Sequence, residues 1–297
     1  LYNDNFLYNE CIENSVKRKN LFSIEKNINK FFLNQKISII LVLYNNLEWF
    51  NYFENKINIM RKKYNYDFDF YIYENNSNVE FKKRLKDFMI SSKGKLLSEN
   101  NESIKFGSII SKERGIYMNN IRNKNKINHG HLDSDYCWLL DSNVYFDDDI
   151  LFKFINGLKN DNSLCSISSL CLLSRASLRE TAKNHLYDTL AFSYGKYNYI
   201  NTTNTCLMKN CISCHRHRRH CQKTEIPEED LIVPGSIVYP ECSFCSHSLI
   251  NTEIYNKVQW TSEHGLGETD WYGFFKNLRN YGKIAMDTKI ISYKRII

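Results

Sequence analysis

The sequence predicts an α/β fold whose core is a mixed, mainly parallel sheet flanked by helices. Residues 37–44 form a continuous apolar run rich in β-branched side chains, which is typical of a strand buried on both faces. Two further apolar runs follow at 69–73 and 136–141, with helical patterns between them. Strands that alternate with helices form βαβ units with parallel strands, so we expect these runs to lie in one sheet.

The other elements follow in chain order. Residues 1–35 are expected to form an N-terminal helical extension. Residues 36–297 are expected to form a single domain, because 42% hydrophobic residues suffice for one large core and 3 prolines and 11 glycines leave no obvious linker. Residues 200–247 are expected to be an insertion rich in cysteine and histidine. Helices are predicted at 47–63, 79–91, 108–123, 147–157 and from 271 onward, and a short strand at 95–98.

Short polar motifs accompany these elements in a fixed order. They are Glu74-Asn75 after the second strand, Arg114 and Arg122 on one helix, Asp141-Ser142-Asn143 after the strand at 136–141, residues 187–191, and residues 265–271. Over residues 36–291 this order resembles nucleotide-sugar glycosyltransferases of the GT-A (Rossmann-like) fold, nearest in pattern to the capsule-associated mannosyltransferase type. The resemblance implies a hexosyltransferase that moves a sugar from a UDP- or GDP-linked donor to a hydroxyl of a saccharide or protein.

The first motifs are suited to binding such a donor. Glu74 and Asn75 have acceptors for the imide N–H of uracil or the amino group of guanine. Arg114 and Arg122 are eight residues apart, about two helical turns, and so share a face that could neutralise a diphosphate. The alternatives are a polar turn for the first pair and solvated helix charges for the second.

Asp141 and Asn143 occupy the place of the family's Asp-x-Asp motif, which implies a Mn²⁺ or Mg²⁺ ion that bridges the donor phosphates. Here an amide replaces the second carboxylate. An amide oxygen can ligate a hard cation, but the lost charge weakens the site, so metal dependence stays open. The aspartates at 147–149 are an alternative, although they also suit the first turn of a helix.

The resemblance places catalytic and acceptor-side residues later in the chain. Asp270, with Glu268 as the alternative, is expected to act as general base, or else to cap the helix that follows. Asp188 is expected to contact a sugar hydroxyl or to be a buried structural carboxylate. Ser246 and His247 are expected beside the acceptor.

A cysteine and histidine cluster lies between residues 206 and 247. Cys211 and Cys214, and likewise Cys242 and Cys245, are two residues apart, which is zinc-ribbon spacing and predicts a structural Zn²⁺. Disulfides are the competing interpretation. Cys206, His220 and Cys221 are alternative zinc ligands.

Composition limits the partners. The formal net charge of +7 favours an anionic ligand, which a nucleotide sugar satisfies, so we expect no nucleic-acid partner. No apolar run approaches the ~20 residues of a membrane span. The protein is therefore expected in the cytoplasm, unless an anchor or neighbouring domain precedes Leu1. Two other functions stay open: a non-catalytic sugar-binding or protein-binding module of this fold, and a zinc-containing nucleic-acid-binding protein suggested by the basic run at 215–220.

Overall fold

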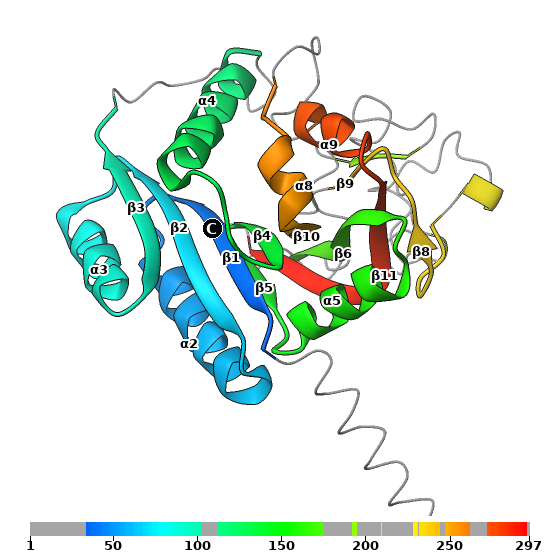
Figure 1. The fold of residues 1–297 in the computed structure, drawn as a ribbon, viewed down its shortest axis with the longest axis horizontal. Coiled ribbons are helices and arrows are strands. Elements are labelled where there is room, and N and C mark those ends of the chain that lie inside the picture. Colours follow the sequence, from blue (N-terminus) through cyan, green and yellow to red (C-terminus); the bar gives the residue numbers. More distant parts are fainter. Residues whose placement is uncertain are drawn as a thin grey trace, which may run out of the picture.

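The computed structural model describes residues 34–101, 112–174, 192–194, 209, 228–230, 232–243, 247–261 and 272–295 (Figure 1). The predicted helical extension therefore lies almost entirely outside the described residues, as does most of the predicted Cys/His-rich insertion. Among the described residues, no helix combines the length and the apolar character that crossing a membrane requires.

A nine-stranded sheet forms the centre of the molecule, in the order β3-β2-β1-β4-β10-β6-β11-β5, and β8 pairs with β11 beside this path. Strands β1 to β4, β6 and β11 run in one direction, while β10, β5 and β8 run in the other. The predicted mixed, mainly parallel sheet flanked by helices is thus confirmed. The bounds are β1 Lys36–Leu43, β2 Asp67–Asn75, β3 Lys93–Glu99, β4 Tyr136–Asp141, β5 Val144–Phe146, β6 Leu164–Ser174, β8 Ile237–Val238, β10 His247–Asn251 and β11 Lys283–Arg295.

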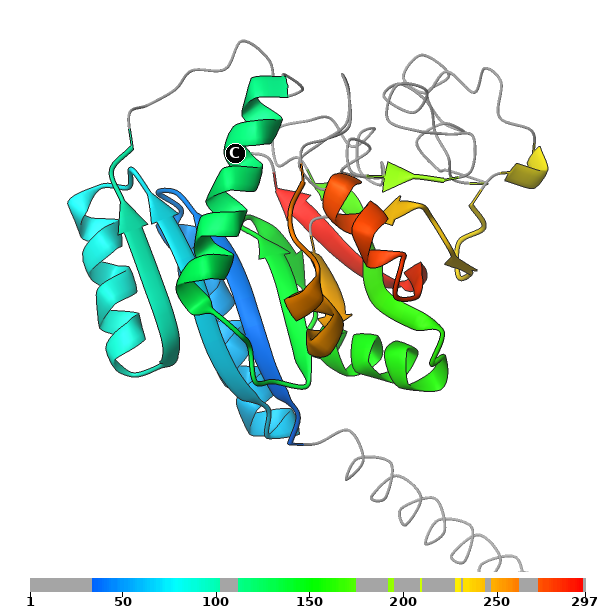
Figure 2. The same ribbon diagram turned by 45° about the horizontal axis from the view of Figure 1, so that its top comes forward.

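Helices cover both faces of this sheet. One face packs against α2, α3 and α5 around a large aromatic core, and the other packs against α8 and α9. Figure 2 shows α4 on the same side as α8 and α9. The bounds are α2 Leu47–Tyr64, α3 Val79–Ile90, α4 Lys112–His129, α5 Ile150–Asn160, α8 Thr252–Lys257 and α9 Tyr272–Leu278; a 3-10 turn spans Glu228–Asp230, and a two-stranded sheet pairs β7 (Phe192–Ser193) with β9 (Cys242–Ser243).

The surroundings of strand β1 explain why its sequence is apolar throughout. Ile37, Ile39 and Leu41 belong to the core under α2, α3 and α5, whereas Ile40 belongs to the core under α8 and α9. Side chains alternate between the faces of a strand, and both faces are covered here, so neither set can be polar. The continuous run therefore marks the centre of the sheet.

Local signals explain how α2 follows β1. The side chain of Asn46 accepts a hydrogen bond from the backbone N–H of Trp49 at 3.3 Å, which satisfies a donor in the first helical turn. The helix ends at Asn65, whose φ of 55° lies in the left-handed region that asparagine tolerates. The polar residues on either side of the apolar pattern thus set both ends of this crossover helix.

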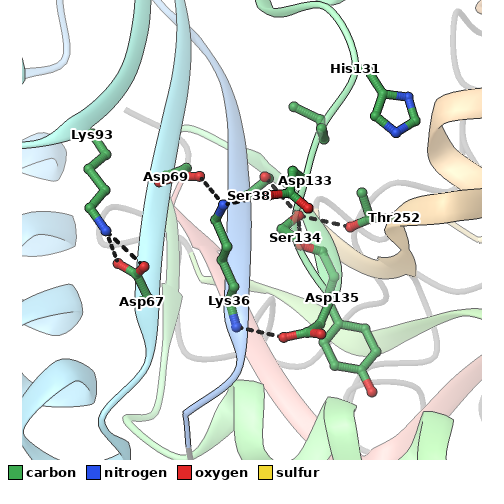
Figure 3. A network of polar contacts seen from close by, with 12 residues as sticks. Lys36, Ser38, Asp67, Asp69, Lys93, His131, Asp133, Ser134, Asp135 and Thr252 are labelled. Carbon is green, nitrogen blue, oxygen red and sulfur yellow. Dashed lines mark hydrogen bonds and ion pairs between the residues drawn. The ribbon is translucent and has the colours of Figure 1, made fainter.

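A network of polar contacts ties the amino-terminal ends of the central strands together (Figure 3). The ammonium of Lys36 lies 3.4 Å from carboxylate oxygens of both Asp69 and Asp133. The hydroxyl of Ser38 donates to that of Ser134 at 2.8 Å, and Ser134 in turn contacts Thr252 at 3.0 Å. These polar side chains at the amino-terminal end of the sheet thus have partners within the protein.

Candidate functional site

A pocket of about 320 Å³ lies at the carboxyl ends of β1 and β4. The chain continues from β1 to β2 and β3 on one side, whereas β4 lies on the other side of β1, so the pocket is at a topological switch point. Open α/β sheets bind ligands in this crevice. The pocket is lined by Ile40 and Val42 of β1, Arg114, Met118, Arg122 and Asn125 of α4, Leu139, Leu140 and Asp141 of β4, and Ser142, Asn143, Tyr255, Trp260 and Lys294.

The end of β4 presents one carboxylate to this pocket, and a buried lysine contacts it. The ammonium of Lys294 lies 3.2 Å from Asp141 Oδ2 and donates to the backbone carbonyl of Ser142 at 2.9 Å. The side chain of Lys294 is 8% exposed and that of Asp141 is 34% exposed. Asn143 turns the chain with a φ of 63°. This turn starts β5, which pairs with β11 and places Lys294 opposite Val144.

Two arginines on α4 form a basic wall of the pocket. Arg114 and Arg122 both line it, which confirms the prediction that they share a helix face. The guanidinium of Arg122 lies 5.1 Å from the ring centroid of Trp260, a cation–π contact that favours this position. With Lys294, three cationic side chains and one carboxylate face the pocket among the described residues, an arrangement that attracts anions.

A buried acceptor also lines the pocket. Asn125 is 1% exposed, and its Nδ2 donates to the carbonyl of Tyr71 at 3.3 Å. Its Oδ1 has no hydrogen-bond partner among the described residues. A buried polar atom without a partner costs free energy, so a ligand that donates an N–H or O–H here would restore a hydrogen bond.

The predicted base-binding residues at the end of β2, Glu74 and Asn75, differ in the partners of their side-chain oxygens. Glu74 is fully buried, and its carboxylate accepts hydrogen bonds from the backbone N–H of Ser77 at 2.6 Å and from the hydroxyl of Ser98. Neither Glu74 nor Asn75 belongs to the described lining of the pocket. Asn75 donates to the hydroxyl of Tyr117 at 3.0 Å, and its buried Oδ1 has no partner among the described residues. Asn75 therefore keeps an acceptor for a ligand, while both carboxylate oxygens of Glu74 already have partners.

His247 lies in the core rather than at a surface. It is fully buried in β10, and its Nε2 is hydrogen-bonded to the hydroxyls of Ser169 at 2.6 Å and Ser292 at 3.0 Å. Burial, and next the positive charge of Lys294, lower the pKa of His247 to about 3. The imidazole is therefore neutral near pH 7, and its buried place does not fit the predicted contact with an acceptor.

The metal predictions have limited counterparts in the structure. Among the described residues, no group of three or more His, Cys, Asp or Glu side chains could hold a metal ion. Asp141 and Asn143 supply one carboxylate and one amide, and the ammonium of Lys294 beside Asp141 offsets its charge, so these two residues are a weak donor set for a divalent cation. Asp148 pairs instead with Lys56 at 2.5 Å, and Asp149 with Lys153 at 3.0 Å.

Several predicted residues lie outside the described part of the chain, and their roles stay predictions. Of the predicted zinc ligands, the structure describes Cys242, which is buried in β9. The undescribed residues are Glu268 and Asp270, Asp188 and Ser246, and the cysteine and histidine ligands Cys206, Cys211, Cys214, His220, Cys221 and Cys245.

Sequence reasoning missed Lys294, Asn125 and Trp260 as pocket residues. In β11 the residues facing inward alternate with exposed ones, and the inward positions at its end are Ser292 and Lys294. A lysine at an inward position of a strand is a usable signal, but only when the direction of each side chain is known.

No protein-family model matches the chain, and no curated protein sequence does. Among solved structures, S. aureus TarS 1-349 is similar with a TM-score of 0.47 and 11% identity, covering 88% of this chain and 60% of that one. The same TarS portion in complex with UDP-GlcNAc gives 0.48 and 11%, covering 88% and 59%. A mycobacterial protein gives 0.45 and 10%, covering 91% and 70%. This chain thus spans about three fifths of the TarS portion that it matches.

Proposed function

We propose that the protein is a GT-A-type glycosyltransferase that uses a UDP- or GDP-linked sugar. The observation that carries this proposal is the pocket at the switch point between β1 and β4, with Arg114, Arg122 and Lys294 in its walls. A nucleoside diphosphate has the negative charge that such a pocket favours, and charge-assisted hydrogen bonds to phosphate oxygens are among the strong polar interactions in proteins.

The buried acceptors extend the same proposal to the nucleoside. Asn125 lines the pocket and has a buried Oδ1 without a partner among the described residues, and Asn75 Oδ1 lies at the end of β2, two strands from β4. Each can accept from an N–H of the base or a hydroxyl of the ribose. The base is therefore assigned to the β2 side, the diphosphate to the basic wall, and the sugar to the space beyond Asp141.

The cations have a chemical role as well as a binding role. In glycosyl transfer the acceptor oxygen forms a bond to the anomeric carbon while the bond from that carbon to the diphosphate oxygen breaks. Negative charge grows on the departing diphosphate, and fixed positive groups stabilise that charge in the transition state. We assign this role to Arg114, Arg122 and Lys294, and the role of base that removes the acceptor proton to Asp270, with Glu268 as the alternative.

The acceptor is proposed to be a hydroxyl of a saccharide or protein, and a structural Zn²⁺ is proposed in the Cys/His-rich segment. The paired spacing of Cys211 with Cys214 and of Cys242 with Cys245 supports the zinc. Metal content and free thiols of the purified protein test it: about one zinc per chain supports the site, whereas oxidised cysteines without zinc favour disulfides.

The donor proposal is tested by calorimetric titration with UDP, GDP, UDP-GlcNAc, UDP-glucose and GDP-mannose. We expect one nucleotide class to bind, and Arg114→Gln to weaken it by at least about tenfold, as for the loss of one charge-assisted contact. Lys62→Gln removes the same charge from an exposed position on α2 and should change nothing. If none of these nucleotides binds, the proposal is wrong.

Turnover separates an enzyme from a binding module of the same fold. The donor that binds is incubated with candidate saccharide acceptors, and free nucleoside diphosphate is measured over time. Release that depends on the acceptor and disappears in Asp270→Asn supports transfer. Tight donor binding without release from any acceptor favours the non-catalytic module.

A further inference from the structure

We propose that Lys294 supplies the positive charge that holds the donor diphosphate beside Asp141, so that donor binding needs no divalent cation. This inference rests on the proposed function and concerns the same pocket. It assigns a diphosphate-binding residue that the motifs of the sequence do not indicate, and it replaces the expected Mn²⁺ or Mg²⁺ by a side chain of the protein.

The ammonium of Lys294 lies where it can act as the cation beside Asp141. Lys294 Nζ lies 3.2 Å from Asp141 Oδ2 and 2.9 Å from the carbonyl of Ser142, within the wall of the pocket. These contacts place a positive charge at the end of β4, against the carboxylate that a bridging cation would need. A lysine is a compact point charge and can bind phosphate oxygens directly.

The ammonium is also held in place before any ligand arrives. Lys294 lies in β11 between two neighbouring strands, opposite Val144 of β5 and Leu173 of β6. Its side chain is only 8% exposed, so it has little freedom to leave. A charge that is already ordered loses little conformational entropy on binding, which favours its use as a fixed phosphate contact.

The described lining of the pocket also supplies few ligands for a divalent ion. Mg²⁺ and Mn²⁺ favour several oxygen ligands, and in nucleotide sites one or two carboxylates join the phosphates and waters. Asp141 is the one carboxylate in the described lining, and Asn143 is neutral. A divalent ion bound to Asp141 would also lie close to the ammonium of Lys294, and like charges repel. Arg114 and Arg122 add two further fixed charges, which together with Lys294 offset the charge of a diphosphate.

The test is calorimetric titration of UDP and GDP into the purified chain, with EDTA in one series and with Mn²⁺ in the other. For the wild type we expect the same dissociation constant within about twofold in both series. Lys294→Gln should weaken binding in EDTA by at least about tenfold and regain part of it with Mn²⁺, because Asp141 then lacks its internal cation. Lys289→Gln, an exposed position on the same strand, is the matched control.

The outcomes distinguish a failure of the role assigned to Lys294 from a failure of the proposed function. Nucleotide binding that requires Mn²⁺ in the wild type overturns the role of Lys294 and leaves the proposed function intact. Equal affinity of wild type and Lys294→Gln in EDTA overturns it too. No binding in any series removes the proposed function itself. If Lys294→Gln does not fold, Lys294→Arg decides: it keeps the charge and should bind in EDTA, and a tenfold loss there would contradict the inference.

Discussion

Glu74 is expected to stabilise the fold rather than to hold a base, because its carboxylate is buried and both of its oxygens have partners. The buried carboxylate accepts from the N–H of Ser77 at 2.6 Å and from the hydroxyl of Ser98, and it lies 3.8 Å from the ammonium of Lys82. These bonds join the end of β2 to the turn before α3 and to β3.

The magnitude follows from those partners. A hydrogen bond to a charged group contributes about 1.5–3 kcal/mol, against about 1 kcal/mol for a neutral pair. Glu74→Gln keeps an acceptor for Ser77 and a donor or acceptor for Ser98 but loses the charge, so the free energy of unfolding should fall by about 1–3 kcal/mol. The ion pair with Lys82 adds at most about 1 kcal/mol because Lys82 is partly exposed.

The assay is urea unfolding followed by circular dichroism, together with calorimetric titration of UDP and GDP. Glu80→Gln removes the same charge from an exposed position in the first turn of α3, and its stability should stay within about 0.5 kcal/mol of the wild type. A Glu74→Gln variant with unchanged stability and at least tenfold weaker nucleotide binding would refute the structural role and restore the base contact.

Two further predictions concern stability. Gly94 has a φ of 125°, and an added Cβ would lie 1.8 Å from a backbone oxygen of β2, so Gly94→Ala should lower the free energy of unfolding in urea by more than about 3 kcal/mol. Gly130 has a φ of 74° and open space around an added Cβ, so Gly130→Ala should cost about 1 kcal/mol. Equal costs for the two variants would contradict this reasoning. Burial lowers the pKa of His129 to about 4 and that of His247 to about 3, below the unfolded value of about 6.5. The unfolded chain therefore binds more protons as the pH falls below about 6.5, and each histidine should remove up to about 1.4 kcal/mol of stability per pH unit until its folded-state pKa is reached. His129→Gln and His247→Gln should flatten this slope, measured by urea unfolding between pH 7 and 4.5, whereas the exposed His131→Gln should not.

Periodicity predicted the central elements because their environments are uniform along the segment. The run at 37–44 is apolar because β1 is covered on both faces. Helix α9 has apolar residues at helical spacing because Phe274, Phe275 and Leu278 all lie in one core. Helical spacing also brought Arg114 and Arg122 to one pocket. In these cases the spacing of residues along the chain matches the faces that the fold buries or turns toward the pocket.

Contacts between distant segments could not be predicted from local sequence patterns. Glu74 has the residue type of a base-binding side chain, yet its carboxylate is engaged by Ser77 and by Ser98 from a neighbouring strand. His247 has the residue type of an acceptor contact, yet β10 inserts between β4 and β6 and buries it among aromatic rings. The residue type limits the chemistry that is possible, while burial and neighbours determine which chemistry is available.

By itself, the sequence determined that this chain folds around a mixed, mainly parallel sheet and that polar motifs gather at the carboxyl ends of its strands. Only the tertiary structure decided that Lys294, 153 residues from Asp141, lies 3.2 Å from its carboxylate. The physical reason is that strand order and register set this distance, and both depend on long-range pairing of β5 with β11 that no local pattern records. The electrostatics of the pocket are therefore a property of the fold.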